Sequence, residues 1–235
     1  MRIGLSASRC ENRNLSHNLR QIESAMASSR GQVDLLCFGE AFLQGFDALT
    51  WNYSVDKDIA LSLSSPTMST LKDWTLRYGM SLATGYIERD NDTLYSSCAV
   101  LSGGRLVHNY RRVSPGWKES SRTDFHYREG ADTGPFTLLG HQITLALCGD
   151  LWEYPHRFRT DHLLIWPVYV DFSLSEWNGG ELDEYAAQAA LASPHTLMVN
   201  SIDSASHGGA FHFHNGRTAA RLPFDQEGIL TVTLP

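Results

Sequence analysis

Short apolar runs typical of β-strands alternate along this chain with stretches in which apolar residues recur every three or four positions. This alternation indicates a fold in which helices cover the faces of a sheet. In the first half we expect strands at 2–6, 33–38, 81–88, 94–101 and 106–110, and helices at 14–29 and after Ser65-Pro66. The sequence therefore predicts an α/β fold.

The second half continues the pattern after a polar segment at 114–134 that has no periodicity. Long irregular segments in compact domains are often functional loops. Beyond it we expect an apolar strand before Cys148, a helix starting near Tyr154, a strand at 163–166, an Ala-rich helix at 181–192, and strands at 196–201 and 229–234. Because no repeat or linker interrupts the chain, we predict a single domain over residues 1–235.

Charge and cysteine usage narrow the class of protein. The net charge of -7 argues against a nucleic-acid or anionic-membrane surface and favours a small-molecule partner. The four cysteines are dispersed, without the spacing of a zinc site or a disulfide framework. No apolar run is long enough to span a bilayer. We therefore expect a cytoplasmic protein that binds neither nucleic acid nor membrane and needs no metal.

A thiol stands at the end of one apolar run, His141-Gln-Ile-Thr-Leu-Ala-Leu-Cys148. The residue at the C-terminal exit of a buried strand faces the crevice where ligands bind in layered α/β folds. Cys148 is therefore placed like a nucleophile, which a neighbouring base and cation would activate. Taken alone, the segment also fits ordinary core packing, because free cysteine is among the most buried residue types.

Glu40 and Lys118 occupy two further strand-exit or loop positions. A carboxylate can accept the thiol proton, an ammonium can stabilise the developing oxyanion, and the sulfur can hold the acyl group. Each residue also has a structural interpretation, since Glu40 could cap a helix and Lys118 could lie in solvent. Together with Cys148 they form a set suited to attack on an amide-like carbon.

The order and the flanks of these residues resemble the nitrilase, or carbon-nitrogen hydrolase, superfamily over nearly the full length of the chain. Phe38-Gly39-Glu40-Ala-Phe42 resembles the family's glutamate segment, with glycine in place of the usual proline. Cys148-Gly-Asp150-Leu-Trp-Glu-Tyr-Pro155 resembles its C-x-[DE]-x-x-x-P nucleophile segment. Weaker similarities occur at 85–89, 94–97, 104–111, 189–200 and 227–232.

The resemblance implies a four-layer α-β-β-α sandwich of the nitrilase type and a homodimer, because such proteins commonly pair through helices. It implies that Glu40 is the base, Lys118 the oxyanion stabiliser and Cys148 the nucleophile that forms a thioester, with no cofactor. We expect first an amidase acting on a small amide, since amide hydrolysis is the broadest activity in the family. An N-carbamoyl amino acid hydrolase comes next, and a nitrilase last.

The cation is where the chain departs from the family pattern. The family's lysine usually follows Tyr-Arg directly, but here Arg112 follows Tyr110-Arg111 and Lys118 lies further on. We favour Lys118 over Arg112, because a compact ammonium suits a crowded pocket better than a larger planar guanidinium. The residues expected to bind or orient substrate are Arg112, Glu119 with Glu129 as its competitor, Gly149 through its backbone N–H, Asp150 and Trp152, with Trp166 and Trp177 as further pocket walls.

Two other functions remain open at this point. His212 and His214 share one face of a strand near His207 and could ligate a metal, which would indicate a metal-dependent hydrolase. The absence of lysine from its usual position could also indicate a homologue that only binds a ligand, because fold does not guarantee activity. The presence of both Glu40 and Cys148 argues against that second interpretation.

Overall fold

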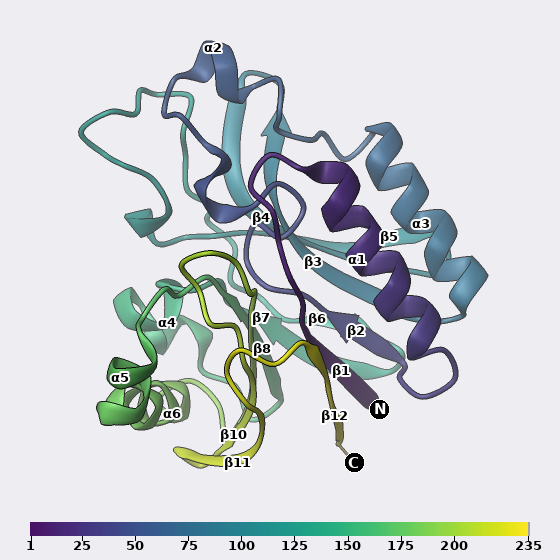
Figure 1. The fold of residues 1–235 in the computed structure, drawn as a ribbon, viewed down its shortest axis with the longest axis vertical. Helices are drawn as coiled ribbons and strands as arrows, with labels where there is room; N and C mark the ends of the chain where they lie inside the picture. Colours follow the sequence, from purple (N-terminus) through teal and green to yellow (C-terminus); the bar gives the residue numbers. More distant parts are fainter. Residues whose placement is uncertain (235) are drawn as a thin grey trace.

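Two six-stranded mixed sheets lie face to face in the computed structural model, which describes residues 1–234 (Figure 1). The first sheet has the order β12-β1-β2-β3-β4-β5 and the second β11-β10-β9-β8-β7-β6. The strands of the first sheet are β1 (Arg2–Ala7), β2 (Leu35–Cys37), β3 (Ser81–Asp90), β4 (Thr93–Ser102), β5 (Arg105–Arg111) and β12 (Gly228–Thr233). Those of the second are β6 (Phe136–Leu138), β7 (His141–Leu145), β8 (Leu163–Val168), β9 (His195–Asn200), β10 (Ala210–His214) and β11 (Arg217–Leu222).

Two long helices, α1 (Leu15–Ser28) and α3 (Pro66–Tyr78), cover the outer face of the first sheet (Figure 1). Asn14 and Ser65 cap their N-termini, because each side chain accepts a hydrogen bond from a backbone N–H of the first turn. The remaining helices are short: α2 (Tyr53–Asp56), α4 (Asp150–Glu153), α5 (Leu174–Glu176) and α6 (Leu182–Ala190). No helix within residues 1–234 is long and apolar enough to cross a membrane.

The main core fills the space between the two sheets. Ile3 and Leu5 of β1 belong to one buried cluster with Leu197 and Val199 of β9, and α6 packs on the far side of the second sheet. A second cluster joins α1 and α3 to the opposite face of the first sheet. Each sheet therefore buries both faces, as a four-layer α-β-β-α sandwich requires, and the predicted fold class is confirmed.

The structure departs from the sequence-based elements in several places: β6, α2 and α5 were not expected, and two further differences are instructive. Strand β11 was not expected because its composition, Arg-Thr-Ala-Ala-Arg-Leu, gives no apolar run, yet it pairs with β10 at the edge of the sheet. The helix expected near Tyr154 begins instead at Asp150, two residues after Cys148. Pro155 then opens a separate 3-10 turn, Pro155–Phe158. The backbone therefore becomes helical immediately after Cys148.

Gly85 of β3 lets the segment after β2 approach the sheet closely. Its backbone N–H donates to the carbonyl of Gly39 at 3.2 Å, and its carbonyl accepts from the N–H of Leu43 at 3.2 Å. A Cβ at this position would overlap the Gly39 carbonyl and lie 2.7 Å from the Cα of Glu40. Glycine at residue 85 is thus a condition for the position of Glu40.

Gly85→Ala should lower the free energy of unfolding in urea by about 1–3 kcal/mol, because the atoms that a methyl group meets are backbone atoms. Gly179→Ala is the matched control, since a Cβ there meets no described atom within 4 Å. Equal stability of G85A and the wild-type protein would contradict the packing described above.

Candidate active site

Glu40 is a buried carboxylate directly beyond the end of β2. Its side chain is 1% exposed and accepts hydrogen bonds from Arg112 Nη1 at 2.9 and 3.2 Å. The hydroxyl of Ser96, on β4, donates to the same carboxylate at 2.7 Å. Charge-assisted hydrogen bonds of this kind hold a carboxylate in one orientation.

Arg112 immediately follows β5, and the strand pairing fixes its position. Its backbone N–H donates to the carbonyl of Ser96 at 2.8 Å, and its Nε donates to Ser114 Oγ at 2.8 Å. The side chain is 3% exposed. Burial lowers the pKa of Arg112, but the charges of Glu40 and Cys148 outweigh burial and raise that pKa above its ordinary value. The guanidinium is therefore a fixed, permanent cation.

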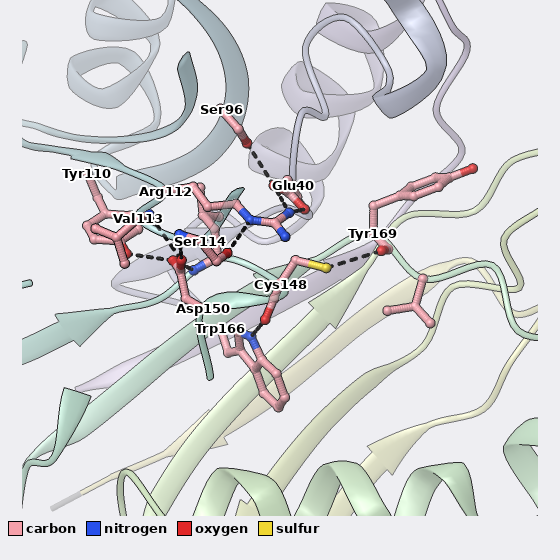
Figure 2. A network of polar contacts seen from close by, with 12 residues as sticks. Glu40, Ser96, Tyr110, Arg112, Val113, Ser114, Cys148, Asp150, Trp166 and Tyr169 are labelled. Carbon is pink, nitrogen blue, oxygen red and sulfur yellow. Dashed lines mark hydrogen bonds and ion pairs between the residues drawn. The ribbon is translucent and has the colours of Figure 1, made fainter. Parts of the chain in front are cut away.

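The third guanidinium nitrogen, Nη2, is the part of Arg112 that remains available. It donates to no acceptor within residues 1–234, whereas Nε and Nη1 are both engaged. Nη2 lies against Gly149, because a Cβ on that residue would be 2.5 Å from it. Figure 2 shows the guanidinium between Glu40 and the segment that carries Cys148.

Cys148 lies just beyond β7 in a left-handed backbone conformation, with φ of 39°. Non-glycine residues rarely adopt this region, and strained residues of this kind cluster at active sites. Its backbone N–H donates to the Pro167 carbonyl at 3.0 Å, and its carbonyl accepts from Trp166 Nε1 at 2.8 Å. The thiol donates to the Tyr169 carbonyl at 3.4 Å.

The environment of the thiol disfavours the thiolate at rest. Burial, followed by the charge of Glu40, raises the pKa of Cys148 to about 12, while the charge of Arg112 acts in the opposite direction. Glu40 is thus the charged group that contributes most to the raised pKa of the thiol. A thiol in this state needs a proton acceptor in order to act as a nucleophile.

The C-terminal end of β8 holds Glu40, which follows a strand of the first sheet, near Cys148, which follows a strand of the second. The N–H of Glu40, from the first sheet, donates to the Val168 carbonyl at 3.2 Å, and the N–H of Cys148 donates to the neighbouring Pro167 carbonyl. Glu40 and Cys148, distant in sequence, are thus anchored to adjacent residues of one strand. Together with Arg112 they form the network drawn in Figure 2.

Asp150 is a structural anchor, which differs from the substrate contact expected for it. One carboxylate oxygen accepts from Tyr110 Oη at 2.5 Å and from the N–H of Leu147 at 2.8 Å. The other oxygen accepts from the N–H groups of Val113 and Ser114 at 3.0 and 2.8 Å. All of these bonds are buried, so Asp150 ties the segment after Arg112 to the nucleophile turn.

Lys118 is not brought to Glu40. Its ammonium contacts Glu129 at 2.6 Å and the Tyr127 carbonyl at 2.8 Å. Glu119, expected as an orienting group, is exposed and accepts from Ser121 Oγ at 2.7 Å. Of the two cations considered from sequence, the structure therefore places Arg112, and not Lys118, on the glutamate.

The tryptophans differ in their relation to the site. Trp166 is fully buried and supports the Cys148 backbone, and Trp177 is buried in an aromatic cluster with Tyr185. Trp152 is 39% exposed and packs edge-on against Tyr185, with ring centroids 5.0 Å apart. Trp152 is thus the only one of these three tryptophans that is substantially exposed.

The histidine pair lies at the other end of the second sheet. His212 and His214 of β10 contact His195 at 3.3 and 3.2 Å. His195 begins β9, whereas Cys148 follows the C-terminal end of the parallel strand β7. Among residues 1–234 no group of three or more His, Cys, Asp or Glu is arranged to hold a metal ion. The metal-dependent interpretation therefore gains no support.

Sequence reasoning missed several members of the network: Ser96, Ser114, Tyr110 and the Tyr169 carbonyl. Ser96 and Ser97 interrupt the apolar strand β4, and buried polar side chains in such a strand need partners. That signal could have identified Ser96. The backbone carbonyl of Tyr169 leaves no trace in the sequence.

Residues 4–159 match the family model described as carbon-nitrogen hydrolase. An arylacetonitrilase from Arthroderma benhamiae is 25% identical over 162 residues, which are 60% of this chain and 48% of that protein. The chain thus spans about half the length of this curated relative.

Solved structures match over the whole chain at low sequence identity, which shows the shared fold. XC1258 from Xanthomonas campestris, a CN-hydrolase superfamily protein, has a TM-score of 0.79 and 17% identity, with 100% of this chain and 90% of that chain covered. An amidase from Nesterenkonia sp. AN1 has a TM-score of 0.76 and 19% identity, with 100% and 93% covered. This chain belongs to the carbon-nitrogen hydrolase (nitrilase) superfamily.

Proposed function

We propose that the protein is a thiol-dependent hydrolase of non-peptide carbon-nitrogen bonds, with a small amide as its substrate. Cys148 is the nucleophile, Glu40 the general base, and Arg112 the cation that stabilises the oxyanion. The observation that carries this proposal is the buried contact between Glu40 and Arg112 beside the thiol. Arg112 takes the role first assigned to Lys118, because Lys118 pairs with Glu129.

The acylation step follows from the positions of these groups. The sulfur of Cys148 attacks the carbonyl carbon while Glu40 accepts the thiol proton, since the resting thiol has a pKa of about 12. Negative charge develops on the substrate oxygen. Arg112 Nη2 and the backbone N–H of Gly149, which donates to no acceptor within residues 1–234, can both bind that oxygen.

Deacylation uses the same carboxyl group. The tetrahedral intermediate expels ammonia or an amine, which takes the proton held by Glu40. A water molecule that donates a proton to Glu40 then attacks the thioester. The carbon-sulfur bond breaks, the carboxylic acid is released, and the proton on Glu40 returns to the Cys148 sulfur. The Asp150 anchor keeps the Cys148 turn and the segment after Arg112 in register through both steps.

Amides rank first among substrates, because a similar structure, that of a glutamate-to-glutamine mutant of the amidase from Nesterenkonia sp. AN1, shows acrylamide added at the active-site cysteine. Nitriles are the second candidate, because the arylacetonitrilase matches in sequence. N-Carbamoyl amino acids are the third. Ammonia release from a panel of all three classes identifies the substrate class.

Cys148→Ala should abolish ammonia release, because the thioester bond forms on its sulfur. The loss should exceed about a thousandfold in kcat while the free energy of unfolding changes little. Cys98→Ala is the matched control at a buried cysteine. Activity retained in C148A refutes the nucleophile assignment, and no release by the wild-type protein from any compound indicates a ligand-binding homologue.

The identity of the cation is tested by two substitutions that remove charge. Arg112→Met should lower kcat/KM by about 10²–10³-fold, because it removes an oxyanion donor. Breaking the buried pair also costs about 3–5 kcal/mol, so folding is checked by thermal unfolding. Lys118→Met should change kcat/KM less than about threefold. The reverse pattern, with K118M folded and inactive, would assign the role to Lys118.

The pH dependence of thiol alkylation tests the shared site without a substrate. Glu40→Gln should move the midpoint of Cys148 alkylation by iodoacetamide to lower pH, because the charge of Glu40 raises the thiol pKa. Arg112→Met should move it to higher pH, because the charge of Arg112 lowers that pKa. Peptide mass spectrometry measures the rates, and protection of buried Cys10, Cys37 and Cys98 shows that the protein is folded. Identical midpoints in all variants would show that neither Glu40 nor Arg112 affects the Cys148 thiol, which would contradict a shared site.

A further inference from the structure

Two glycines flank the guanidinium of Arg112. A Cβ on Gly149 would lie 2.5 Å from Arg112 Nη2 and 3.3 Å from Ser114 Oγ. A Cβ on Gly116 would lie 3.3 Å from the same Nη2. Real Cβ atoms essentially never lie as close as 2.5 Å to another heavy atom, and 3.3 Å is closer than most Cβ contacts.

The backbone gives no reason for glycine at residue 149. Its φ of -61° and ψ of -10° are helical values that any L-amino acid adopts. Glycine in such a conformation is ordinarily less favourable than alanine, because the unfolded chain loses more conformational freedom. What the position requires is the absence of a side chain, and the atom that requires it belongs to Arg112.

The guanidinium cannot move aside without losing its partners. Nε is held by Ser114 and Nη1 by Glu40, and the planar group moves as one unit. The side chain is also almost fully buried, so it is enclosed by protein rather than by solvent. A methyl group at residue 149 would therefore displace the whole guanidinium from Glu40 and from the sulfur.

We propose that Gly149 is a positioning residue, whose missing side chain provides the space in which the arginine guanidinium lies beside the nucleophile. Gly116 is the second glycine of this cradle, because a Cβ there would also lie close to Arg112 Nη2. The inference rests on the proposed function, in which Arg112 is the cation of the site. It makes residues 112 and 149 a coupled pair: arginine at 112 needs glycine at 149, whereas a lysine at 112, which has no planar group, tolerates a Cβ there.

A double-mutant cycle tests the coupling. Gly149→Ala should lower kcat/KM by about 10–100-fold, because small misplacements of a catalytic group have effects of this size. In an Arg112→Lys background the same substitution should change kcat/KM less than about twofold. Gly116→Ala should have a smaller effect than G149A, in the order of the two distances. Gly179→Ala, where a Cβ meets no described atom within 4 Å, is the matched control.

The midpoint of Cys148 alkylation by iodoacetamide gives a second readout that needs no substrate. G149A should move the midpoint to higher pH in the Arg112 protein, because the displaced guanidinium no longer favours the thiolate. The midpoint should not move with G149A in the R112K background. If G149A does not fold, G116A and G116A/R112K carry both measurements.

The outcomes separate the two proposals. Coupling between residues 112 and 149 in alkylation, together with no hydrolysis of any compound, supports the cradle and refutes the proposed hydrolase. Hydrolysis by the wild-type protein with G149A equal to the G179A control refutes the cradle and leaves the hydrolase standing. Equal losses from G149A in the wild-type and R112K backgrounds also refute the cradle.

Discussion

The buried ion pair of Glu40 and Arg112 is the interaction on which the candidate site depends. Two opposite charges, both almost without solvent contact, compensate each other's desolvation at 2.9 Å. Ser96 and Ser114 provide further hydrogen bonds to the two partners, so the pair has one geometry. That geometry leaves Nη2 beside Gly149 without an acceptor among residues 1–234, so the atom available for the proposed chemistry differs from those that make the structural pair.

The four-layer architecture brings these groups together. Glu40 and Arg112 follow strands of the first sheet, whereas Cys148 follows a strand of the second. The exit of β8 offers adjacent carbonyls to Glu40 and Cys148, and the buried Asp150 bridges from the Cys148 turn to the segment after β5. The candidate site therefore lies where strands of both sheets end, and burial there raises the thiol pKa.

The fold and two residues of the candidate site, Glu40 and Cys148, could be predicted from the sequence for the same reason. Apolar runs mark buried strands, and Glu40 and Cys148 stand where such runs end, so their segments could be recognised without coordinates. Strand β11 could not be found in this way, because an edge strand with polar and small residues has no apolar signal.

The candidate cation was harder to predict, because the choice between Arg112 and Lys118 depends on strand register and on the conformation of a loop. Arg111 pairs with Ser97, so the next residue, Arg112, lies beside Ser96 and therefore beside Glu40. Lys118 lies in the aperiodic segment, where Trp117 packs with Tyr127 and directs the ammonium to other partners. A comparison of the sizes of ammonium and guanidinium cannot predict where the Lys118 loop places its ammonium. It also cannot predict the space that Gly149 leaves for the guanidinium.

The most direct measurement is a crystal structure of the Glu40→Gln variant after reaction with acrylamide, because the wild-type protein of this account would hydrolyse the amide. The reaction forms a bond between the Cys148 sulfur and the terminal alkene carbon while the thiol proton passes to the adjacent carbon. The account predicts an adduct on Cys148 whose amide oxygen lies within hydrogen-bonding distance of Arg112 Nη2. An adduct whose oxygen is bound by Lys118, or a Cys148 that remains unmodified while another cysteine reacts, would contradict it.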